Sequence, residues 1–215
     1  MKITYSIQVC NESRELYSLL NFLLKVKDEE DYINVVVDSL HTTDKVKLVT
    51  DYFKDGISVH YRPFDNFHDN VMFHREMCTT EYYFAIDADE MPQEALIKGL
   101  KLVLNEHSVD VLYVPRINIH PGSIQEFLEK SKFQVNEAGW INWPDYQGRI
   151  LKKDVMWSDN MHPKPIHDGK KVGSLGANPG LAMWHIKSIE KQESRWSNSI
   201  DISSPTTTNL YDLLM

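Results

Sequence analysis

The sequence predicts an α/β fold in which a mainly parallel central sheet has helices on both faces. Three observations lead to this prediction. Strand-like segments recur through the first 118 residues, segments with helical spacing of apolar residues separate them, and residues 82–86 form a continuous apolar run, as a strand buried on both faces does. Strands and helices that alternate at these lengths are joined by right-handed crossovers, and this arrangement makes the sheet parallel.

Five strands and four helices are expected in this first part of the chain. Residues 3–9 alternate polar and apolar side chains, and Ser13 is the expected N-cap of a first helix whose leucines recur at helical spacing. Pro92 is expected in the first turn of the fourth helix, where proline is common. The other expected elements are strands at residues 33–37, 57–61, 82–86 and 109–114, and helices at residues 46–53, 66–78 and 95–104.

The pattern changes after Asn118. Residues 119–180 contain seven of the nine glycines and five of the nine prolines, which favours irregular loops. The expected elements are a helix near residues 123–132, short strands near residues 149–152 and 181–186, and an amphipathic helix at residues 188–199 that buries Trp196. The chain is expected to form a single domain, with halves at residues 1–118 and 119–203 and a tail at residues 204–215.

The composition limits the classes of partner and compartment. With 23 Lys and Arg against 31 Asp and Glu, the formal charge is −8, so nucleic acid, which proteins hold through a basic surface, is a disfavoured partner. Cys10 and Cys78 are too few for a disulfide framework, and this favours a reducing compartment. No apolar run approaches 18 residues and the N-terminus alternates polar and apolar residues, so we expect a cytoplasmic protein without a transmembrane segment or a signal peptide.

Polar residues at the expected strand ends are the candidates for a functional site. In a sheet of this kind, ligands bind beyond the carboxyl ends of the strands. The candidates are Asn11, Glu12, Asp38, Arg62, Asp87 and Asp89. For Asn11 and Ser39 a second interpretation is open, because Asn and Ser also cap helices and form turns.

Asp87 and Asp89 form the most informative pair. Two carboxylates at positions i and i+2 of an extended chain face the same side, and a cation relieves their repulsion at the end of a buried strand. Oxygen ligands suit Mg²⁺ or Mn²⁺ in a site that also takes diphosphate oxygens. A solvated acidic turn is the alternative, whereas a calcium loop is disfavoured because Pro92 occupies the position at which such a loop needs glycine.

These residues lie in segments that resemble family 2 glycosyltransferases with the GT-A fold. Residues 83–90 (YFAIDADE) resemble the Asp-x-Asp segment of the family, residues 6–12 (SIQVCNE) its first strand and nucleotide loop, and residues 35–39 (VVVDS) its second strand. The resemblance implies a Rossmann-like GT-A fold in which residues 1–118 bind the nucleotide and residues 119–203 bind the acceptor. It also implies transfer of a sugar from a nucleotide diphosphate donor, most often a UDP-sugar.

The resemblance also implies roles for single residues. Asn11 and Glu12 would lie in the nucleotide loop, Asp38 would contact the base, and Asp87 would point toward the ribose or the donor sugar. Asp89 would hold a divalent ion, Mn²⁺ or Mg²⁺, that bridges to the diphosphate, with Asp87 and His185 as further metal ligands.

A fourth segment, residues 192–196 (QESRW), matches the Gln-x-x-Arg-Trp signature of processive members of the family. Those enzymes extrude polymer through transmembrane helices, and this sequence contains no such segment. Either the match is a coincidence or Arg195 steadies the leaving diphosphate.

The acceptor side of the sequence is less specific. Residues 143–151 (WPDYQGRIL) resemble a segment of the lipopolysaccharide-core type of these enzymes. Trp143 and Tyr146 would stack on an acceptor sugar or, equally, cover the open edge of the sheet. Relatives often carry a His-Glu pair nearby, whereas this chain has His162 followed by Pro163, which leaves His162 a contact to phosphate or acceptor.

An inverting transfer needs a carboxylate that takes the proton of the acceptor hydroxyl. Asp145 is the candidate catalytic base, ahead of Asp159 and Glu137. The acceptor, whether a glycan, a lipid or another hydroxyl compound, the stereochemical outcome and the oligomeric state are left open by the sequence.

Two other functions are weighed against this one. Haloacid-dehalogenase-like phosphatases also end a strand with Asp-x-Asp, but in those enzymes the motif ends the first strand, and Met91 stands here where they have Thr or Val. The other alternative is a non-catalytic module that binds a sugar nucleotide or a glycan.

Overall fold

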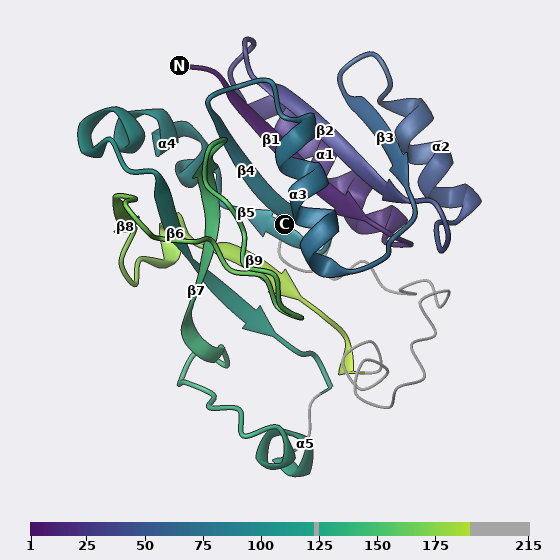
Figure 1. The fold of residues 1–215 in the computed structure, drawn as a ribbon. Helices are drawn as coiled ribbons and strands as arrows, with labels where there is room; N and C mark the ends of the chain where they lie inside the picture. Colours follow the sequence, from purple (N-terminus) through teal and green to yellow (C-terminus); the bar gives the residue numbers. More distant parts are fainter. Residues whose placement is uncertain (123–124, 190–215) are drawn as a thin grey trace.

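The computed structural model describes residues 1–122 and 125–189, and in this part of the chain one nine-stranded sheet carries helices on both faces (Figure 1). The strands are β1 (Ile3–Val9), β2 (Tyr32–Asp38), β3 (Ser58–Arg62), β4 (Tyr82–Asp87), β5 (Glu90–Pro92), β6 (Val111–Ile119), β7 (Ile141–Lys152), β8 (Val172–Ser174) and β9 (Met183–Ile186). The helices are α1 (Ser13–Val26), α2 (Asp44–Tyr52), α3 (Phe67–Met77), α4 (Glu94–His107), α5 (Gln125–Lys130) and the short 3₁₀ helix η1 (Pro179–Leu181). The α/β fold class that the sequence predicts is confirmed.

The order of the strands is β3-β2-β1-β4-β7-β6-β9-β5, with β8 beside β6. Strands β5 and β7 are antiparallel to their neighbours, and the other strands share one direction. Strand β7 lies between β4 and β6 and so joins the strands β1 to β4 to the group formed by β5, β6, β8 and β9. As a result, the carboxyl ends of the parallel strands and the first residues of β5 and β7 lie at one edge of the sheet.

The two faces of the sheet have different coverings. One face packs against α1, α2 and α4 in the larger core, to which the inward side chains of β1, including Ile3, Tyr5 and Ile7, belong. The other face carries α3, which lies in front of β1 and β4 in Figure 1 and packs around Tyr83 in a smaller core. Because side chains alternate along a strand, Ser6 points to the α3 face. Over β7, β6 and β9 this second face carries polar side chains, and these form the site described below.

The ends of two helices show capping by the expected residue types. The side chain of Thr43 accepts a hydrogen bond at the start of α2, and that of Asn66 does so at the start of α3. The expectation that Ser13 caps α1 is wrong. Ser13 is the first helical residue, and Glu12 occupies the N-cap position without a side-chain bond to the helix.

The structure after β4 departs from the sequence-based expectation in three ways. Strand β7 covers Ile141–Lys152, far more than the expected residues 149–152. Pro92 ends the unexpected strand β5 instead of starting α4, which begins at Glu94. The expected strand at residues 181–186 begins only at Met183, because η1 precedes it. The expected helix at residues 188–199 falls almost wholly outside the described residues.

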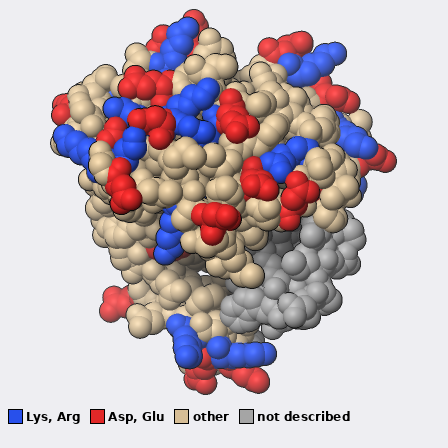
Figure 2. All heavy atoms as spheres, in the orientation of Figure 1, with Lys and Arg blue, Asp and Glu red and all other residues tan. Residues whose placement is uncertain are grey.

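Charge and hydropathy of the described part fit the sequence analysis. On the face shown in Figure 2, Lys and Arg side chains are interspersed with Asp and Glu side chains. Within residues 1–122 and 125–189, none of the helices combines the length and the apolar character that crossing a bilayer requires.

Candidate functional site

The candidate site lies at the edge of the sheet where the parallel strands end. In the order of the sheet, Asp38 ends β2, Asn11 and Glu12 follow β1, Asp87 ends β4, and His185 lies in β9. Neighbouring strands are ~4.8 Å apart, so two strand spacings separate Asp38 from Asp87 across the sheet, and three more separate Asp87 from His185. Asp38 also lies two residues farther along the strand direction than Asp87. The strand-end rule therefore brings the predicted residues to one continuous edge.

Asp38 is held in a fixed orientation. Its Oδ1 accepts hydrogen bonds from the backbone amides of Leu40 (3.0 Å) and Phe64 (3.2 Å), and its Oδ2 lies 2.7 Å from Nδ1 of His41. Burial raises the pKa of the Asp38 carboxyl, but the hydrogen bonds from His41 and the two amides outweigh burial and hold the pKa below its ordinary value. Asp38 is therefore an ionised acceptor at neutral pH.

The side chain of Glu12 stabilises the loop that follows β1. Its Oε2 accepts hydrogen bonds from the backbone amides of Cys10 (3.0 Å) and Asn11 (3.1 Å), so the carboxylate stabilises its own loop. Asn11 is buried. The roles of Asn11 and Glu12 as nucleotide contacts stay predictions.

Asp87 and Asp89 do not face the same side of an extended chain, and that expectation is wrong. Strand β4 ends at Asp87, and the chain turns at Ala88 and Asp89. Asp87 accepts hydrogen bonds from Nε2 of Gln8 and from Nη2 of Arg149, the latter at 2.7 Å. Burial raises the pKa of the Asp87 carboxyl, but the Arg149 charge outweighs burial and lowers the pKa.

Glu90 links two arginines at the centre of the site. Its side chain is 0% exposed, and its Oε1 accepts hydrogen bonds from Arg149 Nη2 (2.5 Å) and Arg116 Nη1 (2.8 Å). Its Oε2 accepts from the backbone amide of Asp87 (3.1 Å). Burial raises the pKa of the Glu90 carboxyl, and the two arginines oppose that rise. Glu90 therefore connects Asp87 in β4 with Arg116 in β6.

Asp145, the predicted catalytic base, is the next carboxylate in this network. Its Oδ2 accepts from Arg116 Nε (2.9 Å) and Nη2 (2.7 Å) and from Asn118 Nδ2 (2.9 Å), and its Oδ1 accepts from Gln147 Nε2 (2.7 Å). Burial raises the pKa of Asp145, but Arg116 and the amide donors outweigh burial and lower it. Asp145 is thus ionised and oriented, and its catalytic role stays a prediction. Asp159, one of the two reserve candidates, is 90% exposed beside His68.

Asp89 and His185 come together at the far end of the network. Nε2 of His185 lies 3.7 Å and Nζ of Lys187 lies 3.6 Å from Asp89 Oδ2. Asp89 is 5% exposed and Lys187 is 1% exposed. Burial lowers the pKa of His185 to about 4, so its ring is neutral at pH 7.

The tautomer of His185 follows from its neighbours. Asn118 donates its amide nitrogen to Asp145, so the amide oxygen faces His185 Nδ1 at 2.7 Å and accepts a hydrogen bond from it. The free electron pair of the neutral ring is then on Nε2, the atom nearer to Asp89. This is the arrangement in which a histidine binds a metal ion, with its other ring nitrogen donating to a second residue. Asp89 and His185 are thus a fitting oxygen and nitrogen pair for Mn²⁺ or Mg²⁺.

The three predicted metal ligands are not assembled as a set. Within residues 1–122 and 125–189, no group of three or more His, Cys, Asp or Glu side chains is arranged to hold a metal ion. Asp87 is instead paired with Arg149. A divalent ion at Asp89 and His185 would therefore need ligands from the substrate, as Mg²⁺ sites with one or two carboxylates commonly do.

The remaining candidates are placed as follows. Arg62 is turned toward the start of α3, where it pairs with Asp65. The ring of His162 lies 6.1 Å from that of Phe67, and the rings of Trp143 and Trp140 are 5.1 Å apart. Tyr146 is 38% exposed. Arg195 lies outside the described residues, as does Trp196.

Sequence reasoning did not assign site roles to Glu90, Arg116, Asn118, Gln147 or Arg149. A signal was available in the alternation of polar residues along β7, because Asp145, Gln147 and Arg149 are separated by two residues each and so share one face of a strand. The same spacing relates Arg116 and Asn118 in β6.

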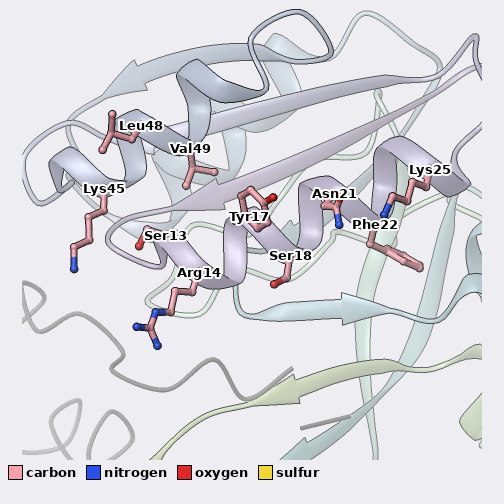
Figure 3. A pocket seen from close by; sticks show the side chains of 10 residues that line it. All are labelled: Ser13, Arg14, Tyr17, Ser18, Asn21, Phe22, Lys25, Lys45, Leu48 and Val49. Carbon is pink, nitrogen blue, oxygen red and sulfur yellow. The ribbon is translucent and has the colours of Figure 1, made fainter. Parts of the chain in front are cut away.

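A larger groove lies away from this edge, between α1 and α2 (Figure 3). It has a volume of about 650 Å³ and is lined by residues of these two helices, among them Arg14, Tyr17, Lys45 and Leu48. None of the network residues belongs to it. The residues that line this groove are apolar, basic or neutral polar, and none of them is an acid. The acidic groups that a base or a metal ligand requires lie instead at the sheet edge, which is therefore the candidate functional site.

Comparison with known proteins supports the fold assignment. No protein-family model and no curated protein matches the sequence. The structure is similar to that of S. aureus TarS, a glycosyltransferase, with a TM-score of 0.60 and 15% identity to TarS residues 1–349, over 86% of this chain and 60% of that one. The chain has a GT-A-like fold.

Two further TarS structures contain ligands. The complex with UDP has a TM-score of 0.59 and 15% identity over 89% of this chain, and the complex with UDP-GlcNAc has a TM-score of 0.57 and 14% identity over 87% of this chain. The chain spans about 60% of the TarS fragment in each case, 62% and 59%.

Proposed function

We propose that this chain is a glycosyltransferase that moves a sugar from a nucleoside diphosphate donor, most simply a UDP-sugar, to an acceptor hydroxyl. The observation that carries the proposal is the order of groups along one sheet edge of a GT-A-like fold: Asp38, then Asp87, then the pair Asp89 and His185. The TarS complexes with UDP and UDP-GlcNAc support the same class of donor.

In this proposal the nucleoside lies between Asp38 and Asp87. Asp38 accepts a hydrogen bond from the base, since its carboxylate is ionised and held by two backbone amides. Asp87, two strand spacings away across the sheet, accepts a hydrogen bond from a hydroxyl of the ribose or the donor sugar. Gln8 and Arg149 hold Asp87 in place.

Asp89 and His185 would hold the divalent ion, Mn²⁺ or Mg²⁺, together with the diphosphate of the donor. Bound there, the ion would supply positive charge to the leaving diphosphate. The chain itself contributes the oriented Nε2 of His185 and the side-chain oxygens of Asp89. Lys187, 3.6 Å from Asp89, adds a fixed positive charge at the same place.

Asp145 is the proposed base for the acceptor. In the transfer, the acceptor oxygen forms a bond to the anomeric carbon, the bond from that carbon to the diphosphate oxygen breaks, and the hydroxyl proton passes to the Asp145 carboxylate. Arg116, Asn118 and Gln147 keep this carboxylate ionised, which is the state that a base needs. The acceptor would be a glycan, a lipid or another hydroxyl compound.

The test is UDP release from UDP-GlcNAc and UDP-glucose in the presence of Mn²⁺. We expect slow donor hydrolysis by the wild-type chain and its loss in Asp89→Ala, with Asp51→Ala, an exposed residue of α2, as the control. Full activity in Asp89→Ala would contradict the proposed role of Asp89. Phosphate release from a monoester would instead support a phosphatase, and UDP-sugar binding without turnover would support a binding module.

A further inference from the structure

Asn118 of β6 lies between the proposed catalytic base and one of the proposed metal ligands. Its side chain is buried, and β6 pairs with β7 on one side and with β9 on the other. The Asn118 Nδ2 lies 2.9 Å from Oδ2 of Asp145 in β7, and the Asn118 Oδ1 lies 2.7 Å from Nδ1 of His185 in β9. A single amide group therefore connects the base with the metal ligand across three neighbouring strands.

The neighbours of this amide fix its direction. Its Nδ2 faces two acceptors, the Asp145 carboxylate and the backbone carbonyl of Ile141, the latter at 3.4 Å. In the reversed orientation the amide oxygen would face both acceptors, and both hydrogen bonds would be lost. Arg116 also holds the Asp145 Oδ2 in place, because it donates to that atom from Nε (2.9 Å) and from Nη2 (2.7 Å). The amide oxygen of Asn118 is therefore directed at His185.

The directed oxygen decides which nitrogen of the neutral His185 ring carries the proton. Two acceptors compete for it: Asn118 Oδ1 lies 2.7 Å from Nδ1, and Asp89 Oδ2 lies 3.7 Å from Nε2. Only the first distance is that of a hydrogen bond, so the proton is on Nδ1. Without an acceptor at residue 118, Asp89 would be the remaining acceptor and the proton would move to Nε2. A protonated Nε2 has no electron pair for a metal ion.

We propose that Asn118 is a positioning residue that prepares the base and the metal ligand together. Its amide nitrogen holds the carboxylate of Asp145, and its amide oxygen keeps the electron pair of His185 on Nε2, the atom that would bind the ion. The inference rests on the proposed function and deepens it, because it makes the readiness of both groups depend on one residue that acts only through them.

Two substitutions separate the two contacts of Asn118. Asn118→Leu has a similar size and removes both the donor and the acceptor. Asn118→Asp keeps an oxygen that accepts from His185 but sets a second carboxylate against Asp145. Asn34→Leu is the matched control, because Asn34 is a buried amide of β2 whose Nδ2 donates to the backbone carbonyl of Met77, outside the site. Circular dichroism and thermal unfolding show whether each variant is folded.

The first measurement is the position of the His185 proton, read by NMR of the full chain labelled with ¹⁵N-histidine, near neutral pH and without metal. The His185 signals are assigned by their loss in His185→Gln. We expect the proton on Nδ1 in the wild type, in Asn118→Asp and in Asn34→Leu, and on Nε2 in Asn118→Leu. A proton on Nε2 in the wild type overturns the proposal, and this test needs no variant at residue 118 to fold.

The second measurement is the affinity for Mn²⁺, followed by electron paramagnetic resonance in the presence of saturating UDP. Removal of the residue that holds a histidine ligand commonly weakens metal binding by ~10- to 100-fold. We therefore expect at least tenfold weaker Mn²⁺ binding in Asn118→Leu, and binding no weaker than that of the wild type in Asn118→Asp and Asn34→Leu. The third measurement is UDP release from UDP-GlcNAc at saturating Mn²⁺, which should be at least tenfold slower in Asn118→Asp, because its second carboxylate displaces Asp145.

The split between the variants distinguishes positioning from a merely structural role. Equal weakening of Mn²⁺ binding in Asn118→Leu and Asn118→Asp overturns the proposal, as does an Asn118→Leu variant in which either the position of the His185 proton or the Mn²⁺ affinity is unchanged. A wild-type rate of UDP release in Asn118→Asp overturns the part that concerns Asp145. These results leave the proposed function standing. A wild-type chain that binds no UDP contradicts the proposed function instead, and the position of the His185 proton, which is read without ligand, then decides alone whether Asn118 orients His185.

Discussion

Replacement of Glu90 by glutamine tests whether the buried network stabilises the fold. Glu90 is 0% exposed and accepts hydrogen bonds from Arg116 (2.8 Å) and Arg149 (2.5 Å). Glutamine keeps the shape and one acceptor oxygen toward the arginines but removes the charge, and its NH2 group replaces the oxygen that accepts from the Asp87 amide. A hydrogen bond to a charged group contributes ~1.5–3 kcal/mol and a neutral one ~0.5–1.5 kcal/mol, so weakening two bonds lowers the free energy of unfolding by about 2–3 kcal/mol.

This loss is measurable by two methods. For a chain of this size, 1 kcal/mol corresponds to ~2–4 °C in Tm, so Glu90→Gln should lower the Tm by about 4–12 °C. Urea unfolding followed by circular dichroism gives the free energy directly. Glu29→Gln, at an exposed loop position, is the matched control and should stay within about 0.5 kcal/mol of the wild type.

A Glu90→Gln variant as stable as this control would refute the reasoning. That result would mean that the arginines gain nothing from Glu90, because Arg149 is already paired with Asp87 and Arg116 with Asp145. Glu90→Ala separates the two explanations. It removes the acceptor as well and should cost about 3–5 kcal/mol, since it leaves buried charges less compensated.

Three further predictions concern single groups. Asp38→Asn should weaken UDP binding at least tenfold by calorimetry, because the base loses its ionised acceptor, and an unchanged affinity would contradict that contact. Asp145→Asn should lower the rate of UDP release by ~10²–10⁴ with little change in UDP affinity, and a normal rate would remove Asp145 as the base. Neutral His74 contributes stability that is fully present above pH 6.5 and is lost as the pH falls toward about 4. In this pH window the free energy of unfolding from urea titrations should therefore depend on pH less steeply in His74→Gln than in the wild type, by up to ~1.4 kcal/mol per pH unit. Exposed His107→Gln is the control, and equal slopes in His74→Gln and the wild type would contradict the burial of a neutral ring.

The parts of the site that lie at the ends of parallel strands could be predicted from the sequence. Asp38 and Asp87 each follow a buried β-branched or apolar run, and the topology of an α/β sheet places such residues at one edge. The sequence predicted that Asp89 follows β4, but it did not predict the direction of its side chain. The chain turns at Ala88, and such a local turn does not alter the spacing of apolar residues from which strands are predicted. His185 was found by resemblance, and its contact with Asp89 is a property of the pairing of β5 with β9.

The network itself could not be predicted, because its contacts join distant parts of the chain. Glu90 is 26 residues from Arg116 and 59 from Arg149. Both arginines contact it because β7 lies between β4 and β6 in the sheet. The prolines and glycines of residues 119–180 favour loops and so obscure β7, although Asp145, Gln147 and Arg149 keep a spacing of two within it. Strand β5 has three residues, too few for a pattern of period two to be recognised.

The charges of the described site lead to a prediction that UDP binding depends on a divalent ion. The carboxylates of Asp87, Glu90 and Asp145 outnumber Arg116 and Arg149 by one, and Lys187 balances Asp89. This part of the site is therefore net negative, although the donor that it is proposed to bind carries a negative diphosphate.

A divalent ion held at Asp89, as proposed, would remove this conflict, because it would supply two positive charges there. Two unit charges ~4 Å apart interact by about 4 kcal/mol at an effective dielectric constant of 20, so even a partial loss of this attraction weakens binding at least tenfold. We therefore expect calorimetry to give at least tenfold weaker UDP binding in EDTA than in Mn²⁺, and a smaller difference in Asp89→Asn, which has already lost the metal-binding carboxylate. Equal UDP affinity with and without the ion in the wild type would mean that positive charge from another part of the chain neutralises the diphosphate, and the proposed role of Asp89 would then be wrong.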